Sequence, residues 1–295
     1  MARGIRLLAA VTLALIICCT ACSDENRQAR QAVLRGTLAT YAGEPRTSDG
    51  HVDIPTLVSQ LQEIDANTYD FLIWHRDTDW TDLKFFLEYT ENTDLKVWVS
   101  LVPPSESKNK KSEPFGLDYV RWADQIGKLS AQYPHLVAWS IDDFTHNLSF
   151  YTPEYLGRMM DAAHAHNPKL AFCPCTYYPK ATQDFADRYS QILDGLLFYY
   201  RAGSAGNNLT DPSLCDEELA TLQERFGEDF PIVLGLYVTG HSRLGDTTVE
   251  YCEEVMTCGH ENAAGVHCYC HQNRGTPKYD LIKRLFGEWS EGAQE

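Results

Sequence analysis

The sequence predicts an α/β protein built as a single-domain (β/α)8 TIM barrel. Short apolar, β-branched or aromatic runs alternate with amphipathic segments of helical period. Eight such repeats follow one another between residues 33 and 295. Parallel strands need helical crossovers, and eight of them close a ring, so the count favours a barrel over an open sheet. The sequence also contains neither a Gly-x-Gly-x-x-Gly turn after the first strand nor a phosphate-binding Gly-Lys-Ser/Thr loop.

Each predicted strand is an apolar run of the length of one buried strand, and a segment with helical periodicity follows it. Pro153 after Thr152, and Pro212 after Asp211, are typical of helix starts, because proline is tolerated in the first turn and Thr or Asp caps it. The predicted strands span 34–41, 68–74, 96–102, 136–142, 170–175, 195–200, 232–238 and 265–270. The predicted helices lie near 53–65, 79–92, 116–132, 153–166, 180–192, 214–226, 247–259 and 278–290.

Residues 1–21 are predicted to be an export signal, with Arg3 and Arg6 before an apolar stretch that is too short to span a bilayer. The segment 19–22 resembles a bacterial lipoprotein signal, in which Cys22 would be lipidated and anchor the protein to a membrane. Cleavage after Ala21 with plain secretion is the alternative. Residues 22–32 are polar and are predicted to be a tether, and 33–295 form the barrel.

Net charge indicates which partners the protein can bind, and cysteine content indicates whether it can form disulfides. The formal net charge of −16 repels phosphate backbones, so nucleic acid is not an expected partner. Of the 10 Cys, Cys18, Cys19 and Cys22 belong to the signal segment and its lipidation site, and the remaining seven, an odd number, leave at least one thiol free. Cys252 and Cys268 could pair, with free buried thiols as the alternative.

Chemistry in such a barrel lies where the strands end, so residues at the predicted strand ends are the candidate site. They are rich in aromatic rings, which stack on sugar faces, and in polar groups that match hydroxyls. The pattern therefore predicts a carbohydrate ligand. The residues predicted to bind it are Trp74, His75, Arg76, Asn147, Tyr177, Tyr199, Arg201, Tyr237, His271 and Asn273; the strand ends also carry Tyr41, Glu106, His241 and Tyr269.

The most informative feature is the pair Asp142 and Asp143 at the end of the fourth predicted strand. Strand alternation directs Asp142 toward the barrel axis, while Asp143 follows the last pleat and can turn over the rim. Two neighbouring carboxylates repel each other, so one should have a raised pKa and act as a proton donor near neutral pH. A structural reading, in which Asp143 caps the next loop, is the alternative.

The seventh predicted strand, 232–238, ends without a carboxylate. This disfavours a scheme in which two Glu residues act as acid and nucleophile. A 2-acetamido group of the substrate could instead supply the nucleophile, with Asp142 orienting that group and Asp143 acting as general acid and base. Asp77 or Glu106 could alternatively serve as the nucleophile.

Three segments carry a family resemblance. Asp142-Asp143-Phe144-Thr145-His146-Asn147 resembles the Asp-Asp-Ile-x-His-Asn signature of family 84 glycoside hydrolases, which include O-GlcNAcase and hyaluronidase-like β-N-acetylglucosaminidases. The segments 172–177 and 67–69 resemble that family's Cys-Pro-Thr-x-Tyr and Asn-Thr-Tyr strands. The resemblance implies a (β/α)8 barrel, neighbouring-group participation, Asp142 as the orienting residue, Asp143 as the acid/base and Tyr177 as a sugar contact.

Three other motifs of that family are absent from this chain. Residues 36–41 lack its Glu-Gly-Phe-Tyr-Gly motif, the second strand lacks its Lys, and no Trp-Asp-Asn follows the sixth strand. These departures favour a different glycan or an unusual amino sugar. No cofactor is expected, and the Cys-rich strands at 173–175 and 268–270 are predicted to hold buried thiols rather than a metal. A catalytically inactive glycan-binding barrel is the second functional hypothesis.

Overall fold

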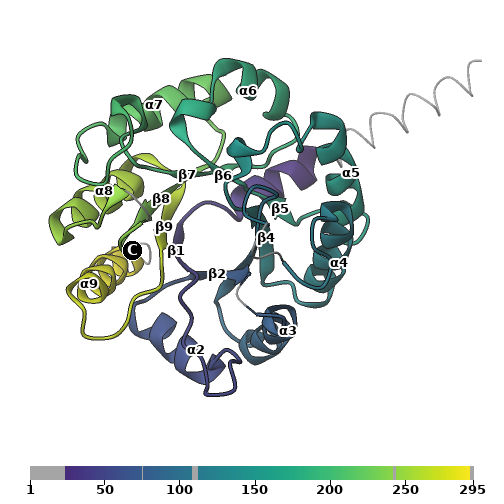
Figure 1. The fold of residues 1–295 in the computed structure, drawn as a ribbon, viewed down its shortest axis with the longest axis horizontal. Coiled ribbons are helices and arrows are strands. Elements are labelled where there is room, and N and C mark those ends of the chain that lie inside the picture. The colour runs from purple at the N-terminus through teal and green to yellow at the C-terminus, as the bar shows by residue number, and fades with distance from the viewer. Residues whose placement is uncertain (1–23, 75, 108–111, 242–243, 293–295) are drawn as a thin grey trace, which may run out of the picture.

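The computed structural model describes residues 24–74, 76–107, 112–241 and 244–292. Its strands are parallel and form a central sheet, and the helices surround it (Figure 1). The strands are β1 (Thr37–Tyr41), β2 (Thr68–Ile73), β3 (Lys96–Leu101), β4 (Leu136–Ile141), β5 (Ala171–Phe172), β6 (Cys175–Thr176), β7 (Leu196–Tyr199), β8 (Ile232–Tyr237) and β9 (Gly265–Tyr269). The helices are α2 (Ile54–Glu63), α3 (Asp79–Thr90), α4 (Tyr119–Gln132), α5 (Pro153–His164), α6 (Gln183–Tyr189), α7 (Cys215–Phe226), α8 (Val249–Asn262) and α9 (Pro277–Gly292), with 3₁₀ turns η1 (Phe144–His146), η2 (Tyr178–Lys180) and η3 (Gly203–Ala205).

The predicted (β/α)8 barrel is confirmed, with its fifth strand divided in two. The hydrogen-bonded order runs β5-β4-β3-β2-β1-β9-β8-β7-β6. β5 and β6 are separated by Cys173 and Pro174, and proline lacks the N–H that a strand ladder needs. The ring closes across this break, because Phe172 O accepts from Asp194 N at 3.1 Å and Pro174 O accepts from Leu197 N at 3.1 Å.

Side-chain alternation separates two apolar layers. On β4, Trp139 and Ile141 pack into the layer between sheet and helices, whereas Ala138 packs inside the ring with Trp98 of β3. The predicted orientation is therefore confirmed for residues 138–141, whereas Val137, predicted to face the helices, packs against the inner layer beside a register shift between β3 and β4. The confirmed orientation directs the residue after Ile141 toward the barrel axis.

Of the two helix starts predicted from a proline in the first turn, one is confirmed. Thr152 caps α5 by accepting a hydrogen bond from Tyr155 N, with Pro153 in the first turn. α7 begins at Cys215, one residue after the predicted start near 214, but Pro212 lies outside its first turn, because the Asp211 side chain accepts from Ser213 N and forms a turn of its own.

The N-terminal part of the described chain is ordered against the barrel. Residues 24–32, within the segment predicted to be a tether, form a helix. Arg27 donates to Gln191 O at 2.6 Å, and Arg30 pairs with the buried Asp194 at 2.7 Å. Of the helices in the described ranges, none combines the length and apolar character needed to cross a bilayer.

The cysteine pairing differs from the one considered in the sequence. Cys215 at the start of α7 forms a disulfide with Cys258 of α8. Cys252 and Cys268 are both buried and free, so the hypothesis of a disulfide between them is wrong and the alternative of free buried thiols is confirmed. The reason is tertiary: the neighbouring helices α7 and α8 bring together two cysteines that are 43 residues apart.

Candidate functional site

A cavity of about 100 Å³ lies where the strands end. Every strand of the ring except β5 supplies a lining residue, either from its last positions or from the loop that follows. The lining is predominantly aromatic, with three carboxyl groups. It consists of Tyr41, Leu72, Trp74, Glu106, Asp142, Asp143, Tyr177, Tyr199, Tyr237, His241 and Tyr269.

Asp142 and Asp143 both line this cavity, as the strand pattern predicts. Asp142 directly follows β4 and accepts a hydrogen bond from Asp143 N at 2.8 Å. Asp143 has a left-handed backbone, with φ of 45° and ψ of 30°. A non-glycine residue rarely adopts this conformation, and such strain is concentrated at functional sites.

The loop after β4 holds Asp143 in that conformation. Its carbonyl accepts from His146 N at 3.0 Å and from Asn147 Nδ2 at 2.9 Å. Asn147 also joins the neighbouring loop, because its Oδ1 accepts from Ser105 N at 3.0 Å. Asn147 was predicted to bind substrate, but it is buried and absent from the cavity wall, so here it positions the loop.

The two carboxyl groups have opposite pKa shifts. Burial, followed by the charges of Asp143 and Glu106, raises the pKa of Asp142 to about 8. Burial also acts to raise the pKa of Asp143, but hydrogen bonds from His146 and Tyr177 and the charge of Arg201 outweigh it, so the pKa is lowered. At neutral pH the pair therefore holds one proton, and the directions of the two shifts favour Asp142 as its site.

Tyr177 is packed between groups that surround Asp143. The His146 ring stacks on it with a centroid distance of 4.8 Å, and the Arg201 guanidinium carbon lies 3.8 Å from its centroid. Its hydroxyl is 3.2 Å from that of Tyr237. Because His146 and Arg201 already contact the ring, Tyr177 offers the cavity its edge and hydroxyl rather than a free face.

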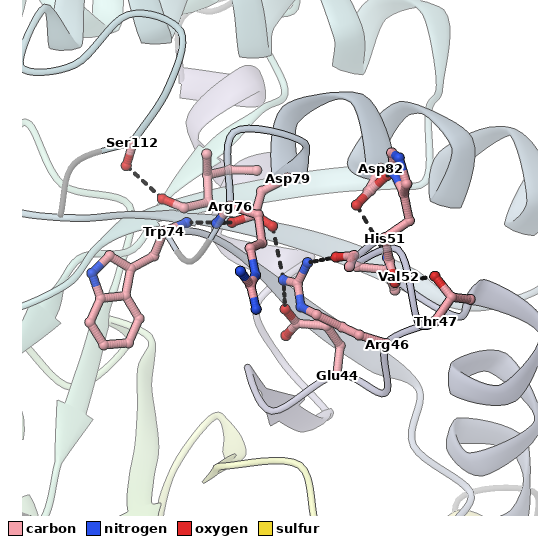
Figure 2. Close-up of polar contacts among 12 residues, drawn as sticks. Glu44, Arg46, Thr47, His51, Val52, Trp74, Arg76, Asp79, Asp82 and Ser112 are labelled. Atoms are coloured by element: carbon pink, nitrogen blue, oxygen red, sulfur yellow. Dashed lines mark hydrogen bonds and ion pairs between the residues drawn. The ribbon is translucent and has the colours of Figure 1, made fainter.

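Trp74 forms another wall of the cavity, and a buried ion cluster holds its backbone (Figure 2). Asp79, at the start of α3, accepts from Trp74 N at 3.0 Å and from Arg76 N at 2.9 Å. Its other oxygen pairs with Arg46 at 2.8 Å, and Arg46 also pairs with Glu44. The loops after β1 and β2 are thereby tied together beside the site.

The structure separates the predicted binding residues into two groups. Trp74, Tyr177, Tyr199 and Tyr237 line the cavity. Arg201 contacts the Tyr177 ring without being part of the lining, whereas Arg76 and Asn273 are exposed and outside the lining. His75 lies outside the described residues.

His271 does not reach the cavity. Its Nε2 is 2.6 Å from Gln60 Oε1, and its Nδ1 is 3.2 Å from Thr40 Oγ1. Burial lowers its pKa to about 4, so it stays neutral between β1 and α2. The prediction that it binds substrate is not supported by this position, because the chain turns back toward α2 after β9.

The two alternative nucleophiles also differ in position. Glu106, in the loop after β3, lines the cavity. Asp77, after β2, is exposed and outside the lining. The geometry therefore favours Glu106 over Asp77 as an additional carboxylate at the site.

Among the described residues, Asp142, Asp143 and Cys175 form a set that could hold a metal ion, with ligand atoms within 4.8 Å of one another. Burial raises the pKa of the Cys175 thiol, as it does that of Asp142. Two of the three groups would have to lose protons to coordinate a cation. The arrangement therefore suits proton transfer better than metal binding.

The sequence reading missed one lining residue and one buried polar pair. Leu72 lines the cavity although it is a plain apolar residue of β2. Asp70 and His267 lie inside the ring, both with 0 % exposure, and are 3.1 Å apart. A charged-type residue in the middle of an apolar strand run is the signal that could have identified them.

The fold is shared with solved glycosidases. No protein-family model and no curated protein matches the chain. A β-D-glucuronidase from Dictyoglomus thermophilum is similar at 15% identity and a TM-score of 0.57; the match covers 87% of this chain and 50% of that one. This chain thus spans about half of that relative.

Two further structures match over more of their own length. Active domain 2 of a Pyrococcus furiosus chitinase, complexed with chito-oligosaccharides, has 11% identity and a TM-score of 0.57, over 87% of this chain and 95% of that one. A GH5_18 protein from Streptomyces cattleya, in complex with Manb1-4GlcNAc, has 13% identity and a TM-score of 0.57, over 80% and 76%. At these identities the similarity shows the barrel fold, and the resemblance to family 84 stays a prediction.

Proposed function

We propose that the protein is a glycoside hydrolase that uses the Asp142–Asp143 pair for acid–base chemistry. The observation that carries this proposal is the pair itself: adjacent carboxyl groups with opposite pKa shifts, at the mouth of an aromatic-lined barrel cavity. Protonated and ionised carboxyl groups side by side supply what glycosidic cleavage requires. The glycosidases among the structural neighbours support the same class of substrate.

The finer proposal is cleavage of N-acetylated sugars, with Asp142 orienting the acetamido group and Asp143 as general acid and base. In the free protein the pKa shifts favour the proton on Asp142, whereas that scheme needs it on Asp143. An acetamido N–H that donates to Asp142 would favour its ionised form, and the scheme requires the shared proton to pass to Asp143 as the substrate binds. Substrate binding would then create the general acid.

A second scheme keeps the proton on Asp142 and uses Glu106 as nucleophile, since Glu106 also lines the cavity. A catalytically inactive glycan-binding barrel is the remaining alternative, because the same aromatic wall could bind sugar without cleaving it. Leaving-group dependence and the acetamido requirement separate these possibilities.

The test is a panel of aryl glycosides with and without a 2-acetamido group, assayed with wild type, Asp142→Asn and Asp143→Asn. We expect Asp143→Asn to lower kcat at least about 100-fold on nitrophenyl N-acetylglycosides, and much less on dinitrophenyl ones, which need no protonation to leave. Asp142→Asn should impair both leaving groups equally. Asp161→Asn, exposed on α5, is the matched control and should leave kcat unchanged.

Hydrolysis confined to sugars without the acetamido group would exclude substrate assistance and favour Glu106 as nucleophile. If no aryl glycoside is cleaved while sugars still bind, the protein is the binding barrel instead.

We also propose that the protein is exported and anchored through lipid on Cys22. The disulfide between Cys215 and Cys258 supports an oxidising compartment, where such bonds persist. The carbohydrate substrate would then be met outside the cytoplasm.

A further inference from the structure

A chain of hydrogen bonds lies inside the barrel and ends at the cavity wall. Ser100 Oγ donates to Asp70 Oδ2 at 2.7 Å, and the same oxygen is 3.1 Å from His267 Nε2. The other ring nitrogen, Nδ1, is 2.9 Å from the hydroxyl of Tyr199. Of these residues only Tyr199 lines the cavity.

The sheet register explains how Tyr199 reaches His267 across an intervening strand. Tyr199 of β7 is in register with Gly235 of β8, and Gly235 with His267 of β9. A Cβ at position 235 would lie 2.9 Å from carbon atoms of the Tyr199 ring. The glycine therefore leaves the space in which that ring lies.

The buried carboxylate determines the direction of the hydrogen bonds. A carboxylate can only accept, so an ionised Asp70 requires the hydrogen of the His267 ring on Nε2. With that ring neutral, as the proposal below takes it, Nδ1 is an acceptor and the Tyr199 O–H donates to it. The Tyr199 oxygen is left with lone pairs only, so toward a ligand it is an acceptor.

We propose that Asp70 and His267 are positioning residues that make Tyr199 a hydrogen-bond acceptor for a sugar hydroxyl at the cavity wall. This inference rests on the proposed carbohydrate function and adds a specificity element to it. A pair of such groups with no exposed surface costs desolvation energy, and their alignment on the hydroxyl of a residue that lines the cavity offers a reason for keeping them there. Sugars with a hydroxyl at that position would be selected over deoxy or O-methyl analogues.

The first test needs no ligand. Long-range ¹H–¹⁵N NMR of histidine-labelled protein at pH 7 should show His267 protonated at Nε2 and unprotonated at Nδ1. In Tyr199→Phe the Nδ1 signal should shift most, because it loses its donor. Protonation at Nδ1 in the wild type would overturn the proposal, because Tyr199 would then face the ligand as a donor.

The second test is a double-mutant cycle with Tyr199→Phe and His267→Gln. The probes are nitrophenyl N-acetylglucosaminide for turnover, and N-acetylglucosamine with its monodeoxy analogues for binding by calorimetry. Each single variant should weaken kcat/KM or affinity about 5- to 10-fold, and the double variant no further, because both remove the same ligand contact. One deoxy analogue should bind wild type and Tyr199→Phe equally, an equality that a merely structural role would not produce.

Tyr189→Phe is the matched control, because its hydroxyl donates to Tyr151 O in the layer outside the ring. It should leave affinity and kcat/KM unchanged. Additive losses in the cycle would overturn the positioning role while leaving hydrolysis intact. Turnover absent for every glycoside would remove the proposed function alone, since the binding series still reports on Tyr199; absence of binding by every sugar would overturn the contact as well.

Discussion

Two adjacent aspartates differ in charge because their surroundings differ. Asp142 continues the inward-facing side of β4 and is buried at the aromatic-lined cavity. Asp143 has a left-handed backbone conformation, and its carboxyl group interacts with His146 and Tyr177. The sequence predicts the pair, its position and the raised pKa of one member. It does not predict which member, because that depends on His146, Tyr177 and Arg201, which three separate strand ends bring together.

This charge arrangement predicts a pH dependence of both activity and stability. kcat/KM should fall as the pH rises through about 8, where the pair loses its shared proton. The folded-state pKa of Asp142 lies above its ordinary value of 3.8, so the native state binds the extra proton and the free energy of unfolding decreases between about pH 4 and pH 8. Asp142→Asn removes this cost. Its Tm should exceed that of wild type by at least about 2 °C at pH 8 and by less at pH 5.

Differential scanning calorimetry at the two pH values measures the stability part. An Asp142→Asn Tm below that of wild type at pH 8 would contradict the raised pKa.

The strands and their glycines decide which side chains can meet. The divided β5–β6 strand was predicted as one run, and proline explains the break. Gly235 has a different role, because the missing side chain lets Tyr199 of β7 lie across β8. The sequence shows a glycine within an apolar strand, but only the register reveals the ring that occupies its place.

Gly235→Ala should therefore disturb the site more than an ordinary glycine substitution. The added Cβ meets the Tyr199 ring at 2.9 Å, and such overpacking costs about 1–3 kcal/mol. We expect a Tm lowered by a few degrees and kcat/KM lowered about 10-fold, measured by thermal unfolding and aryl glycoside turnover. Gly157→Ala on α5 is the control: nothing lies within 4 Å of its Cβ, and alanine favours helix by up to about 1 kcal/mol. Equal losses in the two variants would show that Gly235 has no specific role.

At the scale of the molecule, the helix at residues 24–32 packs against the barrel. Residues 24–32 contact the segment between α6 and β7 through Arg27 and Arg30. A lipid anchor at Cys22 would therefore hold the barrel close to the membrane rather than on a long flexible tether.

Replacement of Cys22 tests the proposed lipid anchor. In a bacterial host, Cys22→Ala should release the protein from the membrane fraction to the soluble fraction, because stable anchoring depends on the attached acyl chains. Cys270→Ala is the matched control, since Cys270 is a free, partly buried thiol of the barrel and should leave fractionation unchanged. Fractionation, followed by immunoblotting of both fractions, provides the measurement. Wild-type protein found entirely in the soluble fraction would contradict the anchor.

The local pattern of the chain was sufficient for the alternation of strands and helices, the barrel class, and the location of Asp142 and Asp143 at its mouth. These features depend on periodicity and chain order, which the sequence contains directly. Four other features depend on distances between residues far apart in sequence. They are the site of the proton on the aspartate pair, the Cys215–Cys258 disulfide, the position of His271 outside the cavity, and the Asp70–His267–Tyr199 hydrogen-bond chain. Only the packing of the strands and helices against one another brings those residues within hydrogen-bonding, covalent or electrostatic range, so the tertiary structure alone decides them.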